Sequence, residues 1–399
     1  MAKQGKNTHL EHVEDNIINF GSDGGKSAIK ILRHLGNYLT GGGPDISKVM
    51  VTTKWDGAPA VVCGTDPSDG KFFVGTKSVF SQTPKICKSD SDVQRMYDGA
   101  LAQKLSACLR YLADCNIKGV LQGDLMFTDD KETKNIKGNR YLTFRPNTIT
   151  YAVDPKTPLG KKIKSASLGI VFHTKYKGSS LATMTASFDV NDSDFKSNSF
   201  VWIQKAKFED LDKKATFTTS ERRQFDSAVN KAEGSLKQAS SVLDLIQSNK
   251  KPLGFDTEFK KFFNNFVKNA QDTPSVDAAY IMFAHHLGKE FAKAIEKNKT
   301  LQAQEQKVFK FVEYIDLMEE HEKKFKMVIA SYFNIQKAKL MLVDKMKVVS
   351  SLKLFVDMGT HYEATAPEGF VAISSEGAVK LIDRLEFSRL NFTVPKNWG

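Results

Sequence analysis

Residues 49–64 are VMVTTKWDGAPAVVCG. Two short runs rich in apolar and β-branched residues, VMVTTKW and APAVVCG, predict two strands, with the tetrapeptide KWDG at 54–57 where they meet. A lysine amine is a nucleophile only when it is neutral, and burial and neighbouring cations favour that state. A glycine lets the backbone approach a ligand closely. This strand-loop-strand unit therefore presents Lys54 as a candidate nucleophile, with Gly57 beside it for close approach of a ligand.

Further strand signals surround this unit. The turn-forming stretch TDPSDG (65–70) precedes KFFVGTK (71–77), so the chain should return as a hairpin. Other strand patterns are GVLQGDLMF (119–127), TITYAVD (148–154), SLGIVFHTKY (167–176), FVAIS (370–374) and AVKLIDR (378–384). The lysine-rich stretch PKTPLGKKIK (155–164) predicts a loop between two of them.

Helical spacing of apolar residues dominates the other regions. Residues 7–40 predict a helix that Gly41–Pro44 end, and residues 91–115 predict another helical segment. From about residue 206 to 358 strand signals almost vanish, and residues 301–348 predict one or two long helices.

Within that helical block, one stripe of phenylalanines predicts a buried helix face. The spacing i, i+4, i+7, i+8 and i+11 places them on one side of a helix: Phe255, Phe259, Phe262, Phe263 and Phe266. Asp256 is placed to cap this helix, and Ser275 to begin the next. We expect the stripe to be core and not a base-stacking surface.

These patterns predict an α+β fold, in which a core of antiparallel sheets and helices is interrupted by a large all-α insertion. The expected units are an N-terminal helical segment (1–46), the first part of the core (47–205), the helical insertion (206–358) and the last strands of the core (359–399). Because the insertion has its own apolar stripes, we expect it to pack as a separate bundle.

Composition restricts the class of protein. The chain has 399 residues and a net charge of +12, which favours a polyanionic partner such as nucleic acid. No apolar run approaches the roughly 20 residues that span a bilayer, and the N-terminus lacks the apolar core of a secretory signal, so we expect a cytoplasmic protein with no membrane partner. The four cysteines have no C-x-x-C spacing and are expected to be reduced thiols.

The tetrapeptide at Lys54 resembles motif I, K-x-D-G, of the covalent nucleotidyltransferases, which comprise ATP-dependent DNA ligases, RNA ligases and mRNA capping enzymes. In that superfamily the lysine attacks the α-phosphate of ATP or GTP and forms a lysyl-nucleotide. The companion motifs have counterparts here in the family's order. They are VGTKS with Lys77, GVLQGDLMF with Asp124, LGIVFHTKY with Phe172, PEGFVAI with Glu368, and AVKLID with Lys380.

The resemblance implies a nucleotidyltransferase core, of the ATP-grasp-like ligase type, and a role for each matched residue. Lys54 and Lys380 would be catalytic, with Lys380 on the α-phosphate. ATP would be bound by Asp56, Gly57, Lys77, Asp124, Phe172 and Glu368, with Phe172 stacked on the purine and Lys77 near the ribose. Mg²⁺ would be held by Asp124 and Glu368.

Several positions depart from the family pattern. Ile382 stands where motif V often has a second lysine, Asp124 replaces the usual glutamate, and Thr52 replaces a glutamate common in adenylating members. Only 19 residues follow Lys380, too few for the OB-fold of most DNA ligases and capping enzymes. RNA ligases are therefore the expected relatives.

The sequence predicts an ATP-dependent nucleic-acid ligase, similar to RNA ligases, that joins a 5′-phosphate to a 3′-hydroxyl end through lysyl-AMP on Lys54. Two alternatives stay open: a GMP-capping or other nucleotidyltransferase, and a non-catalytic scaffold or nucleic-acid-binding protein with a degenerate ligase fold. The helical insertion would bind the polynucleotide or a protein partner. His9, Glu11, His12 and Asp15 could share a helix face as metal ligands, but a solvated helix start is the favoured interpretation.

Overall fold

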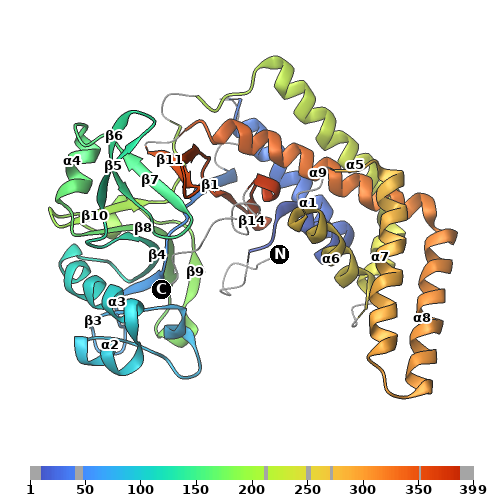
Figure 1. Ribbon diagram of the computed structural model, residues 1–399, viewed down its shortest axis with the longest axis horizontal. Helices are drawn as coiled ribbons and strands as arrows, with labels where there is room; N and C mark the ends of the chain where they lie inside the picture. The colour runs from blue at the N-terminus through green and yellow to red at the C-terminus, as the bar shows by residue number, and fades with distance from the viewer. Residues whose placement is uncertain are drawn as a thin grey trace.

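The computed structural model describes residues 10–40, 48–210, 214–248, 253–269, 273–349 and 352–386. His9 and the expected helix stop at Gly41–Pro44 lie outside these residues. Three sheets and a group of helices make up the fold, with the helices α5, α7, α8 and α9 to the right in Figure 1. The α+β class with largely antiparallel sheets is confirmed.

Sheet A is the smallest sheet and carries two of the predicted site residues. Its antiparallel order is β1-β13-β14, with bounds β1 (Val49–Lys54), β13 (Gly369–Ser374) and β14 (Gly377–Leu381). Because side chains alternate along a strand, one face presents the valines and phenylalanine that join the core of the helical region, including Val51 and Phe370. The opposite face carries Lys54 and Lys380.

Sheets B and C form the remainder of the β region. Sheet B has the order β10-β8-β4-β2-β3, with β9 beside β8, and comprises β2 (Ala60–Thr65), β3 (Phe72–Gly75), β4 (Val120–Phe127), β8 (Leu168–Lys177), β9 (Thr185–Ser187) and β10 (Val201–Lys205). Sheet C has the order β12-β11-β7-β6-β5, with β5 (Glu132–Ile136), β6 (Asn139–Phe144), β7 (Ile149–Val153), β11 (Lys353–Asp357) and β12 (Tyr362–Ala364). Strand β10 pairs parallel with β8.

Helices and a second core complete the β region. Helices α2 (Asp90–Met96) and α3 (Gly99–Leu112) carry Val93, Leu105 and Leu112, which pack in one cluster with Leu121 and Ile170 of sheet B. Phe127 and Trp202 of sheet B pack with Phe144 and Tyr151 of sheet C. The β region is therefore layered, with helices, sheet B and sheet C in succession.

A short helix occupies the lysine-rich stretch that was expected to be a loop. Helix α4 (Pro158–Ser165) begins where the Thr157 hydroxyl accepts a hydrogen bond from the Gly160 N–H, with Pro158 in the first turn. Threonine at the N-cap followed by proline is a favourable helix start. This local signal was present in the sequence and outweighs the run of lysines.

The helical region begins with α1 (Asn16–Tyr38), which follows a 3-10 turn at Val13–Asp15, and continues with α5 (Thr219–Ser248), α6 (Phe255–Lys268), α7 (Val276–Glu296), α8 (Leu301–Glu320) and α9 (Glu322–Met346). The phenylalanine stripe is core, because Phe255, Phe259, Phe262 and Phe263 are all buried. Ser275 caps α7 as predicted, whereas the N-cap of α6 is Gly254 and Asp256 lies in its first turn.

The helical block does not pack by itself. Its core is continuous with the apolar face of α1 and with the inner face of sheet A, in one cluster that includes Ile17, Leu35, Val51, Phe225 and Phe370. The expectation of a separate bundle over 206–358 is therefore wrong in this respect, and β11 already belongs to sheet C. In the described residues, no helix is both long and apolar enough to span a bilayer.

Candidate functional site

Lys54 and Glu368 meet at the end of sheet A. Lys54 is the last residue of β1 and pairs with Gly369, the first residue of β13, so Glu368 lies directly beside it. The Lys54 Nζ atom forms an ion pair with the Glu368 carboxylate across 314 residues of sequence. Gly369 has a φ of +151°, and a Cβ atom there would come within 2.5 Å of the Leu381 carbonyl oxygen. Glycine is therefore required for the chain to turn from Glu368 into β13.

Lys380 lies on the same face of sheet A as Lys54. Val371 pairs with Thr52 on one side and with Lys380 on the other, so these three share a face. Lys54 is two residues beyond Thr52 and points the same way. Burial, together with the positive charge of Lys54, lowers the pKa of Lys380 below its ordinary value. The two predicted catalytic lysines are therefore close enough for the charge of Lys54 to change the pKa of Lys380.

The pKa of Glu368 also depends on the charges of the other predicted carboxylates. Burial raises the pKa of Glu368, the charges of Asp56 and Asp124 raise it further, and the ion pair with Lys54 opposes them. Asp124 is the partner of Ala60 in the pairing of β4 with β2, and its side chain is partly exposed. Residues from β1, β4, β14 and the start of β13 thus converge on one place.

Asp56 and Gly57 hold the loop after Lys54 against its neighbours. Asp56 is buried and accepts hydrogen bonds from the Asn147 side chain at 2.7 Å and from the Thr148 and Ile149 N–H groups, both at 2.8 Å. A Cβ atom at Gly57 would lie 2.5 Å from the Asp124 Cβ atom. Both residues therefore position the loop, and the hydrogen bonds that Asp56 accepts make it a poor ligand for a nucleotide.

Phe172 does not face this site, which corrects the predicted stacking role. Its side chain is fully buried in the core between sheet B and α3, where it packs on Phe195 at a ring separation of 5.7 Å. A ring enclosed on both faces cannot stack on a purine. The pairing of β4 with β8 contains a β-bulge: Gln122 pairs with Thr174 and Gly123 pairs with Phe172, so His173 is the extra residue. The bulge changes the direction in which the side chains of this part of β8 point. The residue that approaches Asp124 is His173, with 3.8 Å between the imidazole Nε2 and the carboxylate.

Lys77 lies at the far edge of sheet B. It begins the short 3-10 helix η3 (Lys77–Phe80) just after β3 and is exposed. Val62 pairs with Gly75 and Ala60 pairs with Asp124, so Lys77 lies at the Asp124 end of the sheet but beyond the edge strand.

A cavity of about 580 Å³ opens beside Lys54, within the size range of small-molecule sites. Its aromatic wall is Trp55, Tyr151 and Trp202, and Lys205 and Lys207 also line it. The Trp55 ring stacks on Tyr151 at 5.4 Å, while its Nε1 atom is buried and has no hydrogen-bond partner. Sequence reasoning missed Trp55, although it stands next to the candidate nucleophile.

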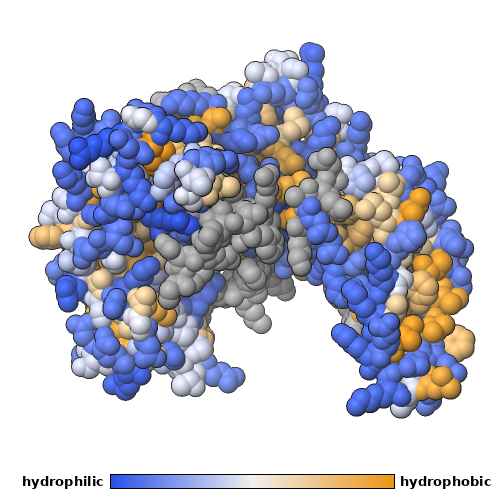
Figure 2. Space-filling model, in the orientation of Figure 1, coloured by the Kyte–Doolittle hydropathy of each residue, from blue (hydrophilic) through white to orange (hydrophobic). Residues whose placement is uncertain are grey.

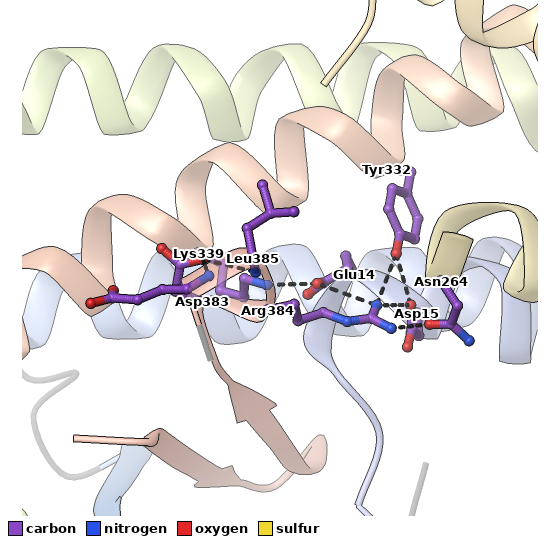
Figure 3. Close-up of polar contacts among 9 residues, drawn as sticks. Glu14, Asp15, Asn264, Tyr332, Lys339, Asp383, Arg384 and Leu385 are labelled. Carbon is purple, nitrogen blue, oxygen red and sulfur yellow. Dashed lines mark hydrogen bonds and ion pairs between the residues drawn. The ribbon is translucent and has the colours of Figure 1, made fainter. Parts of the chain in front are cut away.

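A buried charge cluster forms where the chain leaves β14, and sequence reasoning missed it as well (Figure 3). Lys339 of α9 and Glu14 are both completely buried and form an ion pair at 2.6 Å. Arg384 contacts Asp15 at 3.3 Å, the Tyr332 hydroxyl at 3.3 Å, and Asn264. These contacts tie the N-terminal segment, two helices and the chain after β14 together.

The N-terminal segment also reaches Lys380 directly. The Lys380 N–H donates a hydrogen bond of 2.8 Å to the Glu11 carbonyl, and His12 forms a parallel bridge with Lys380. Burial lowers the pKa of His12 to about 3, so its imidazole is neutral. The predicted solvated helix start is therefore wrong at His12 and Asp15, because His12 lies against β14 and Asp15 is held by Tyr332 of α9 and by Arg384.

Asp124 and Glu368 are the candidate ligands for a metal ion at this site. Among the described residues no three or more His, Cys, Asp or Glu side chains are grouped as metal ligands. Mg²⁺ is often held by only one or two carboxylates together with substrate phosphates, and Asp124 and Glu368 are oxygen donors of that kind close enough to influence each other. The residues present therefore fit a phosphate-bound Mg²⁺ and not a site made by protein alone.

A protein-family model described as a family of unknown function (DUF6267) matches residues 7–396. The chain belongs to this family. No curated protein and no solved structure gives a match. The DUF6267 chain thus places Lys54, Asp124, Glu368 and Lys380 together.

Proposed function

We propose that this protein is an ATP-dependent nucleotidyltransferase of the polynucleotide-ligase kind, which forms a lysyl-AMP intermediate on Lys54. The observation that carries the proposal is the convergence of Lys54, Glu368 and Lys380 at the end of sheet A, with Asp124 of sheet B beside them. The motif resemblance assigns these residues to one site although they lie far apart in the sequence.

The arrangement supports the proton transfer that such a reaction needs. An ammonium group cannot attack phosphorus, so Lys54 must first lose a proton. The Glu368 carboxylate contacts Nζ, and burial raises the pKa of Glu368, so it is a suitable acceptor for that proton. The neutral amine would then form a bond to the α-phosphorus while the bond to the oxygen that bridges the α- and β-phosphates breaks. Pyrophosphate leaves and carries away the second amine proton, so that a neutral phosphoramidate nitrogen remains.

Charge around the phosphates would be balanced by the other site residues. Lys380 lies on the same sheet face as Lys54 and would stabilise the charge on the α-phosphate. Mg²⁺, held by phosphate oxygens, Asp124 and the Glu368 oxygen that does not take the proton, would supply further positive charge. The AMP would pass to a 5′-phosphate end, and a 3′-hydroxyl would displace it to seal the strand.

Incubation with radiolabelled ATP or GTP tests the proposal. We expect transfer of label from [α-³²P]ATP to the protein, in an acid-labile bond, with unlabelled ATP competing better than GTP. A clear preference for GTP would favour a capping type of nucleotidyltransferase. Failure to label with either nucleotide would contradict the proposal and favour a non-catalytic scaffold.

The cavity wall leads to a prediction about the purine. Trp55→Leu should weaken ATP binding about tenfold, since stacking of a base on an aromatic ring contributes about 1–3 kcal/mol, and Trp55 lines the cavity next to Lys54. Phe172→Leu should lower thermal stability but leave the Kd for ATP unchanged, because Phe172 is core. Calorimetric titration of folded Lys54→Arg protein carrying either change would measure both Kd values. A larger loss of affinity from Phe172→Leu would show that the purine binds on the other side of sheet B.

A further inference from the structure

Helices α7 and α8 form an antiparallel hairpin that extends away from the sheets (Figure 1). Ten large apolar side chains are exposed in the part of the chain that the structure describes, and six of them lie on this hairpin: Ile281, Met282, Leu301, Val308, Phe309 and Val312. Figure 2 shows hydrophobic residues gathered over the same helices at the lower right. Exposed apolar surface concentrated in this way marks an interaction site.

The same hairpin carries a groove that suits another helix, and the exposed Ile281 lines it. The groove between α7 and α8 has a volume of about 1050 Å³. Its α7 side presents small residues four apart, Ala284, Gly288 and Ala292, and its α8 side presents Phe311 and Ile315. Small residues spaced by one helical turn allow a partner helix to approach closely.

Charge is distributed unevenly along the hairpin. Its outer half, residues 287–310, has six lysines against three glutamates, a net of +3. Its inner half, residues 276–286 and 311–320, has five acidic residues and no lysine or arginine, a net of −5. Two hairpins that lie side by side in opposite directions would therefore place each basic outer half against the other's acidic inner half. This complementarity is satisfied twice under a two-fold axis, as an isologous interface requires.

The size of the face is sufficient for such a contact. The 20 residues of α8 give a helix about 30 Å long, and two packed helices form a face about 20 Å wide. Each copy would bury about 600 Å², and the pair about 1,200 Å², which lies at the lower limit for a specific interface.

We propose that the α7–α8 hairpin is a homodimerisation surface, on which a second copy of this chain docks its own hairpin in the opposite direction to make a four-helix bundle. The occupant is a second copy because the hairpin is complementary to itself in charge. This inference does not depend on the proposed nucleotidyl transfer.

Sedimentation velocity across micromolar concentrations tests the dimer. The wild-type mass should rise from 44.5 kDa towards twice that value. Val308→Glu/Val312→Glu should remain monomeric, whereas Phe200→Glu, a change at an exposed phenylalanine outside the hairpin, should dimerise like wild type. A wild-type protein that stays monomeric at every concentration would overturn the proposal.

A charge-exchange experiment tests the antiparallel direction and does not rely on apolar residues. Lys293→Glu/Lys297→Glu changes the net charge of the outer half from +3 to −1, and Glu313→Lys/Asp316→Lys/Glu320→Lys changes that of the inner half from −5 to +1. Each variant alone should lose self-association, and a mixture of the two should form the heterodimer, because both contacts become attractive again. If either variant dimerises as well as wild type, or the mixture yields no heterodimer, the proposed pairing is wrong. Capture of only basic peptides or of nucleic acid by a monomeric hairpin would also overturn it.

Discussion

Lys54→Arg should form no nucleotide adduct while the wild type gains the mass of one AMP. Arginine keeps the positive charge and can still pair with Glu368, so the fold and ATP binding should persist. Its guanidinium stays protonated at all relevant pH values and cannot act as a nucleophile. Intact mass after incubation with ATP and Mg²⁺, followed by peptide mapping, measures the result. We expect a loss of more than about a thousandfold, since the nucleophile itself is removed.

The controls for this experiment separate site chemistry from folding. Lys54→Ala should also form no adduct. Asp124→Ala and Glu368→Gln should reduce the rate but leave the adduct on the peptide that contains Lys54. Lys207→Arg, at the wall of the same cavity, should behave like wild type. An adduct on another lysine, or one that persists in Lys54→Arg, would contradict the assignment of the nucleophile.

The strands next to Lys54 were predictable because their signals are local, whereas β5, β6, β9, β10, β11 and β12 were not predicted from the sequence. Alternation around Lys54 and the glycine that follows it predicts strand, loop and strand, and β1 and β2 have these positions. Phe172 shows the limit of such reasoning. A bulge at His173 changes which side chains face the site, and a bulge depends on the pairing of β8 with β4, not on the sequence of either strand alone.

The association of the helical block with sheet A could not be predicted from apolar stripes. A stripe shows that a helix is buried on one side but does not show which element covers it. Val51 and Phe370 look like ordinary strand residues, yet they belong to the same core as Phe225. The buried carboxylate of Glu14 was equally invisible, since its partner Lys339 lies 325 residues away.

The other large effect is expected at that buried pair. Lys339→Met should lower the free energy of unfolding by about 3–5 kcal/mol, because it leaves the fully buried Glu14 carboxylate without its partner. One Glu14 oxygen already has no hydrogen-bond partner, and Arg384 is 3.9 Å from the other, so the remaining structure can compensate only in part. Urea unfolding at neutral pH measures the difference. Lys345→Met is the matched control on the same helix, since Lys345 pairs with Glu221 at the surface and its loss should change stability little.

The double variant Glu14→Leu/Lys339→Met decides whether the pair stabilises the protein or only satisfies its own charges. Removing both charges avoids a lone buried carboxylate, so most of the lost stability should return. If the double variant is as unstable as Lys339→Met alone, packing at α9 and not charge explains the loss. Arg384 lies four residues after Lys380, just beyond the end of β14, and belongs to the same charge cluster as Lys339. Folded Lys339→Met should therefore also form the nucleotide adduct more slowly than the double variant. Equal rates in the two would show that the cluster holds the helices together without positioning Lys380.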